Sequence, residues 1–146
     1  MTQPISRRDL SLLVPALAAA AARAQTQAPA PAALGFMVYH DKQIPYKGDD
    51  QKKGREFFNG TTHTGYHIAM HETIIGAGLQ THPPHKHEHE ELVIVMEGSL
   101  EVHNEGLTEV AEAGSVIYFA SNQMHNGRNT GATPCRYYVL ELRAAA

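Results

Sequence analysis

The sequence predicts an all-β domain with the architecture of a small barrel or jelly roll. Short apolar or alternating runs recur along the chain, and glycine, asparagine or proline separates most of them. Apart from the N-terminal region, no segment shows a sustained helical period with caps. With 42% hydrophobic and 18% charged residues, the 146-residue chain is expected to form one domain with a real core. Short antiparallel strands must close their edges or pack as two sheets, which favours a barrel or jelly roll.

The N-terminal 24 residues have the order of an export signal. Ser6-Arg7-Arg8-Asp9-Leu10 precedes an uncharged run, and Ala22-Arg23-Ala24 is a small-x-small cleavage site. The paired arginines resemble the twin-arginine motif, so we expect a twin-arginine-type signal peptide over residues 1–24 and a periplasmic or secreted mature protein with no stable membrane insertion. A Sec-type signal with coincidental arginines and a disordered alanine-rich tail remain alternatives.

Residues 25–34 consist mainly of alanine, proline and glutamine, with one threonine, a composition that predicts a flexible linker. The barrel is then expected over residues 35–146. Its expected strands, in order, are Phe36–His40, Glu56–Asn59, Tyr66–Ile75, Leu92–Glu97, Leu100–His103, Val116–Phe119 and Arg136–Leu142.

The strand Tyr66–Ile75 offers a candidate catalytic residue. Alternate positions from Tyr66 to Ile74 form its more apolar set, which is expected to face the interior and includes Glu72. An inward Glu72 is a candidate proton-transfer group, with a rim position or a structural hydrogen bond as alternatives. His67 and His71 are then expected to face outward.

A cluster of histidines beside turn glycines indicates a metal site. Seven of the ten histidines fall between His63 and His89. His85 and His87, about 7 Å apart on a strand, can hold one ion, whereas Glu91 would lie roughly 20 Å from His85 unless the chain bends. His89 is expected at that bend, in a solvated or supporting role. Imidazoles and a carboxylate in this pattern, completed by His125 after Gly114, suggest a site built from two β-segments.

Composition excludes several classes of function. A net charge of −3 and a pI near 6.3 leave no basic footprint for nucleic acid, and no apolar stretch reaches the roughly 20 residues that span a bilayer. The single cysteine, Cys135, permits neither an intrachain disulfide nor a thiolate cluster, and is expected to be a buried filler of the last strand. The expected partner is a small molecule.

Two motifs resemble those of the cupin superfamily. They are His85-x-His87-x3-Glu91-x6-Gly98 and Gly114-x10-His125-x3-Asn129, and the resemblance covers residues 36–142. It implies a double-stranded β-helix, with an octahedral metal on His85, His87, Glu91 and His125 and open positions for water or substrate. Three departures concern the turns and leave the ligand positions filled: Gly78 lies one residue further from His85, Ala120 replaces a proline, and Asn122 replaces a glycine, whose left-handed conformation asparagine tolerates.

The donor set suits manganese or iron best, with nickel, cobalt, copper and zinc as alternatives. Two classes of function stay open. One is an exported small-molecule metalloenzyme with a dioxygenase- or isomerase-like reaction, which the resemblance suggests. The other is a non-catalytic metal- or small-ligand-binding protein of the cell envelope. The resemblance also implies a homodimer. His82 belongs either to the mouth of the site or to a surface loop.

Overall fold

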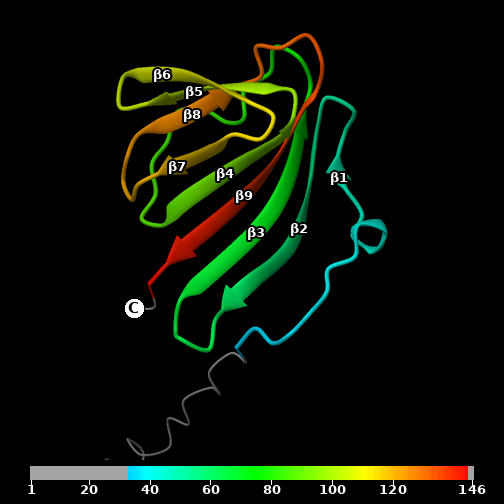
Figure 1. Ribbon diagram of the computed structural model, residues 1–146, viewed down its shortest axis with the longest axis vertical. Helices are drawn as coiled ribbons and strands as arrows, with labels where there is room; N and C mark the ends of the chain where they lie inside the picture. Colours follow the sequence, from blue (N-terminus) through cyan, green and yellow to red (C-terminus); the bar gives the residue numbers. More distant parts are fainter. Residues whose placement is uncertain (1–32, 145–146) are drawn as a thin grey trace, which may run out of the picture. The chain divides into compact units, whose positions relative to one another are not determined.

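The computed structural model describes residues 33–144 (Figure 1). The expected signal peptide over residues 1–24 and nearly all of the expected linker over residues 25–34 lie outside the described residues. Within residues 33–144, no helix has both the length and the apolar character needed to cross a membrane.

The described chain is built from antiparallel strands in two sheets (Figure 1). The large sheet has the order β1-β2-β3-β9-β4-β7, and the small sheet has the order β6-β5-β8. The strands are β1 (Lys47–Gly48), β2 (Lys52–Thr61), β3 (His67–Ile75), β4 (Glu90–Glu97), β5 (Ser99–Asn104), β6 (Leu107–Glu112), β7 (Val116–Phe119), β8 (His125–Arg128) and β9 (Cys135–Arg143), and a short 3-10 helix, η2 (Asp41–Gln43), precedes them. The predicted all-β class is confirmed.

One hydrophobic core joins the two sheets. Val93 and Val95 of β4 and Val139 of β9 belong to the same buried cluster as Leu100 and Val102 of β5. Along each of these strands the core residues alternate with more exposed ones, as strand geometry requires when only one face is fully covered. The result is a jelly roll whose two inner faces pack together, a double-stranded β-helix.

Left-handed turns connect the strands that build the site. Gly98, between β4 and β5, has φ +76°, and a Cβ there would lie 2.7 Å from the carbonyl oxygen of Pro134, so no other residue fits without a shift. Gly114 has φ +92°, and Asn122 has φ +63°. The expectation that Asn122 takes the left-handed conformation in place of glycine is therefore confirmed.

Most predicted strands are present, with differences at the start of the described chain and in the small sheet. Phe36–His40 forms no strand in the described chain, and Phe36 is 97% exposed. Strand β6 escaped prediction because only Ala111 of its six residues is buried, so its hydrophobic pattern is weak. Strand β8 escaped because its buried residues include the polar His125 and Asn126.

Candidate metal centre

Main-chain pairing brings the two motifs together. His85 lies in the segment before β4, and His125 is the first residue of β8. The two residues form an antiparallel bridge, in which the His85 amide donates to the His125 carbonyl at 3.1 Å and the His125 amide donates to the His85 carbonyl at 2.9 Å. This bridge fixes one ligand candidate from each motif beside the other.

Three imidazoles form a nearly equilateral triangle. The ring centroids are 4.8 Å apart for His85 and His125, 4.9 Å for His87 and His125, and 5.3 Å for His85 and His87. Glu91, at the start of β4, adds a carboxylate whose Oε2 lies 3.2 Å from Nε2 of His87. The ligand atoms of His87, Glu91 and His125 all lie within 4.8 Å of one another. The four sequence-predicted residues thus surround one small region.

A second group of three potential ligands shares His125. Its other members are His85 and His82, and their ligand nitrogens also lie within 4.8 Å of one another. His82 therefore lies at the site, rather than on a remote surface loop.

Backbone carbonyls orient two of the imidazoles. Nδ1 of His87 donates to the carbonyl of His89 at 2.8 Å, and Nδ1 of His125 donates to the carbonyl of Gln123 at 2.9 Å. With Nδ1 protonated, Nε2 of each ring keeps its lone pair, which is the form that binds metals.

Two buried ring nitrogens in the site have no hydrogen-bond partner within the described part of the chain. They are Nδ1 of His85 and Nε2 of His125, and His125 is only 2% exposed. Leaving a buried polar atom unpaired costs free energy, which a bound ligand would offset. Unpaired imidazole nitrogens beside a carboxylate fit a divalent transition metal.

The electrostatics of the site disfavour its ionised forms in the absence of a cation. Burial lowers the pKa of His125, and the neighbouring His85 and His87 lower it further. Burial also raises the pKa of Glu91; repulsion from Glu141 adds to the rise, whereas His87 opposes it. Neutral imidazoles are the form that binds metals, and a bound cation would favour the ionised carboxylate of Glu91.

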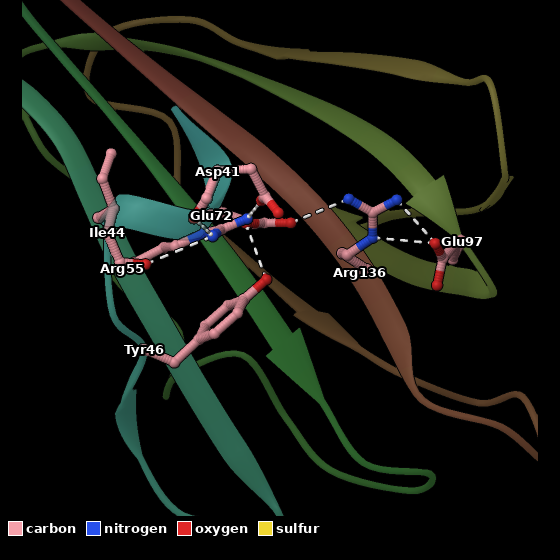
Figure 2. Close-up of polar contacts among 7 residues, drawn as sticks. All are labelled: Asp41, Ile44, Tyr46, Arg55, Glu72, Glu97 and Arg136. Atoms are coloured by element: carbon pink, nitrogen blue, oxygen red, sulfur yellow. Dashed lines mark hydrogen bonds and ion pairs between the residues drawn. The ribbon is translucent and has the colours of Figure 1, made fainter. Parts of the chain in front are cut away.

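Strand β3 turns its other face to the cavity, so the expected inward orientation of Glu72 is wrong. His71 and Thr73 line the cavity that contains the histidines. Glu72 lies on the opposite face of the sheet, where Figure 2 shows it between two arginines. The alternation of apolar residues along β3 gave the wrong inner face because the outer face is also covered. There η2 and Tyr46 lie against Arg55 and Glu72, and every residue of β3 is at least half-buried.

Glu72 is fully buried and multiply bound (Figure 2). Its Oε1 accepts a hydrogen bond from Arg136 at 3.0 Å, and its Oε2 accepts one from Tyr46 at 3.0 Å and another from Nε of Arg55. Glu72 therefore has the structural hydrogen-bonding role that was the alternative to proton transfer, and its contacts place it away from the candidate metal ligands.

The site opens into a cavity of about 370 Å³ between the sheets. Its lining includes a carboxylate that sequence analysis missed, Glu141 of β9, whose oxygens lie 3.9 Å from Nδ1 of His71 and 3.6 Å from Nε2 of His89. The sequence of β9 could have predicted this residue, because the inward positions Tyr137 and Val139 alternate along the strand and the next one on the same face is Glu141. His89 stacks on His87, with ring centroids 3.5 Å apart and planes 8° apart, and is in neither ligand group.

Other predicted positions have structural roles. Cys135 is fully buried at the start of β9, as expected of a filler of the last strand. Asn129 is also fully buried, and its amide donates to the carbonyls of Ile75, Gly76 and Thr133.

Comparison with known proteins agrees with this architecture. Residues 71–141 match the family model Cupin_2, described as a cupin domain. A search of curated proteins gave no match to this chain. Among solved structures, an RmlC-like cupin from Shewanella frigidimarina is 17% identical, with a TM-score of 0.62 over 75% of this chain and 93% of the other.

Two further similar structures are named as enzymes. The polyketide cyclase RemF from Streptomyces resistomycificus is 20% identical, with a TM-score of 0.59 over 77% of this chain and 87% of the other. A "predicted oxalate decarboxylase" from Thermotoga maritima is 18% identical, with a TM-score of 0.59 over 73% of this chain and 98% of the other. At these identities the likeness shows the fold alone. The family match supports a cupin domain over residues 71–141, and the solved structures share its fold.

Proposed function

We propose that this cupin domain holds a divalent transition metal on His85, His87, Glu91 and His125 and acts as a small-molecule metalloenzyme. The observation that carries the proposal is a pair of buried nitrogens, on His85 and His125, that have no hydrogen-bond partner among residues 33–144 and lie in a triangle of imidazoles beside the Glu91 carboxylate. Manganese or iron is the preferred ion, because imidazole and carboxylate donors suit both. When bound, such an ion supplies a Lewis acid or a redox centre for an oxygen-bearing substrate.

The cavity supports a small organic substrate. Its volume of about 370 Å³ lies at the small end of ligand pockets, which span about 300–1,000 Å³. Apolar side chains from the core, including Val93, Leu100 and Val102, line it together with the polar Glu141 and His71. A dioxygenase- or isomerase-like reaction on a small oxygenated compound suits such a mixed lining. In this proposal Glu141, beside His71 and His89, is the carboxylate placed to exchange a proton with the substrate.

Metal content tests the first part of the proposal. The purified mature protein should hold one transition metal ion per chain, measured by inductively coupled plasma mass spectrometry. His87→Ala should lose it, because it removes a ligand from the triangle. His89→Ala should retain it, since the ligand groups exclude His89 and the substitution keeps the His89 carbonyl that orients His87. Equal loss from both variants would contradict the assigned ligand set.

Turnover assays test the second part. Oxygen consumption and product formation would be measured with the metal-loaded protein against panels of phenolics, dicarboxylates and sugars. Turnover that disappears in His87→Ala would support the enzyme. Tight stoichiometric metal without any turnover would favour the alternative, a non-catalytic metal- or small-ligand-binding protein of the cell envelope.

We also propose that the protein is exported by the twin-arginine route to the periplasm or beyond. The support is the sequence order of Arg7-Arg8, the uncharged run and the cleavage site near Ala24. Fusing residues 1–24 to a reporter should give export that is lost when both arginines are replaced by lysine. Export that survives the replacement would instead indicate a Sec-type signal.

A further inference from the structure

The segment before β4 carries a local insertion at the site. The Thr81 amide donates to the Gly127 carbonyl at 2.9 Å, and four residues later His85 pairs with His125. Three residues, His82-Pro83-Pro84, therefore lie opposite the single Asn126 of β8. Prolines have no amide hydrogen and cannot continue the ladder, so the segment must bulge here. A bulge in a paired segment redirects the side chain beside it.

The redirected side chain is His82. Its ring centroid lies 3.9 Å from that of His85 with the planes at 86°, and 5.9 Å from that of His125. Nδ1 of His82 donates to the carbonyl of Pro83 at 2.9 Å. This repeats the arrangement of His87 and His125, in which a backbone carbonyl binds Nδ1 and leaves the Nε2 lone pair for a metal.

Hydrogen bonds hold the backbone just before His82, and the His82 side chain is half-buried. Thr81 is buried, and its hydroxyl oxygen both donates to the Gly127 carbonyl at 3.2 Å and accepts from the Gly127 amide at 3.0 Å. Lys52 also donates to the Thr81 carbonyl. His82 thus projects from an anchored segment, at the edge of the cavity, toward two of the residues assigned to the ion.

We propose that His82 is a fifth protein ligand of the metal. Two nitrogens bound to one ion at about 2.1 Å lie about 3.0 Å apart when adjacent and about 4.2 Å apart when opposite. The ligand nitrogens of His82, His85 and His125 all lie within 4.8 Å of one another, so they must draw closer together to bind one ion. His82 then fills one of the two positions that four ligands leave open in a six-coordinate site.

This inference rests on the proposed metal site, and one experiment separates the two. Zn²⁺ alone serves as a diamagnetic probe, loaded at one equivalent into mature protein whose histidines carry ¹⁵N. Long-range ¹H–¹⁵N NMR spectra then count the imidazoles with a metal-bound nitrogen. We expect four in the unchanged protein and three in His82→Gln. Competition with a chelator should show at least a tenfold weaker Zn²⁺ affinity in His82→Gln, the scale on which changes around a metal alter its binding.

The matched control is His103→Gln. His103 lies on β5, where Nδ1 contacts the Thr108 hydroxyl at 2.9 Å, and it is absent from the cavity lining. It should leave both the count and the affinity unchanged. Three coordinated imidazoles in the unchanged protein would overturn the role of His82 while leaving the four-ligand site intact. No coordinated imidazole would overturn the metal site itself. Because the unchanged protein alone gives the decisive count, the test survives a variant that fails to fold.

Discussion

At the scale of single residues, the hydrogen bond of one ring nitrogen determines what the other can do. His82, His87 and His125 each bind a backbone carbonyl through Nδ1. The carbonyls come from residues one or two positions away along the chain, so each tautomer is set by local backbone rather than by distant packing. The chain therefore presents Nε2 lone pairs to the site before any metal arrives, which lowers the reorganisation that binding requires.

Cys135 should be unreactive in the native protein at neutral pH. It is fully buried, and burial raises the pKa of its thiol to about 11. At pH 8 only about a thousandth of such thiols are ionised, and the thiolate is the form that reacts. We expect Ellman's reagent to label native protein very slowly at pH 8, with faster labelling as the pH rises toward 11. Protein unfolded in guanidinium chloride is the control and should react with one equivalent at once. Rapid labelling of the native protein at pH 8 would contradict this.

The two motifs and their resemblance to a known family predicted the four candidate ligands, but the direction of other side chains depended on packing. The two motifs place His85, His87, Glu91 and His125 beside turn glycines, and turn residues have local signals. Glu72 differs because its direction depends on which face of β3 is more fully covered. That in turn depends on contacts with η2 and Tyr46, which no local pattern of β3 contains.

At the scale of elements, Glu72 joins three neighbouring strands of the large sheet (Figure 2). Arg55 lies directly opposite it on β2, and Arg136 reaches it from β9. A third contact, from Tyr46, attaches the segment before β1 to the same carboxylate. Each arginine also has a second acidic partner: Arg55 pairs with Asp41, and Arg136 pairs with Glu97.

Glu72→Gln should destabilise the fold without affecting the metal site. Removing one partner of a buried ion pair costs about 3–5 kcal/mol, because it leaves the other partner's charge uncompensated. We expect the free energy of unfolding, measured by urea titration, to fall by about 3 kcal/mol, while the metal content of the folded variant stays at one ion per chain. Loss of the metal with unchanged stability would instead support a role for Glu72 at the site.

Glu97→Gln is the matched control for that change. Glu97 also binds Arg136, at 2.7 Å, but its side chain is 64% exposed. Exposed ion pairs contribute about 0–1 kcal/mol. The control should therefore change the free energy of unfolding by less than about 1 kcal/mol. Equal effects of the two variants would show that burial does not distinguish them.

Strands were predicted correctly where hydrophobic and polar residues alternate clearly, and wrongly where strand formation depends on pairing with a neighbouring strand. The strand Val116–Phe119 begins and ends as predicted. Phe36–His40 has the composition of a strand but lacks a partner in the described chain, where the nearby Leu34 amide makes a single contact with the Thr61 carbonyl. A strand forms only when a neighbour satisfies its amides and carbonyls, and composition does not contain that information.

At the scale of the whole described domain, the assigned ligands come from both sheets. Glu91 belongs to β4 of the large sheet, whereas His125 belongs to β8 of the small sheet. His85 and His87 lie in the segment that connects β3 of the large sheet to β4. An ion on these residues would therefore link the two layers across the core. Unfolding must separate the layers and disperse the ligands, so metal binding and folding are coupled.

This coupling predicts that metal raises the stability of the domain as a whole. A ligand that binds only the folded state adds about 2.7 kcal/mol at a free concentration 100 times its Kd. We expect manganese or iron at that concentration to raise the midpoint of thermal unfolding by several degrees, measured by calorimetry, and a chelator to reverse the rise. His87→Ala should show no rise at the same concentration, whereas His103→Gln should match the unchanged protein. Since a link between the sheets acts on one cooperative unit, the transition should move as a single peak. A metal-dependent second peak, or stoichiometric binding with an unmoved midpoint, would mean that the ion does not join the two layers.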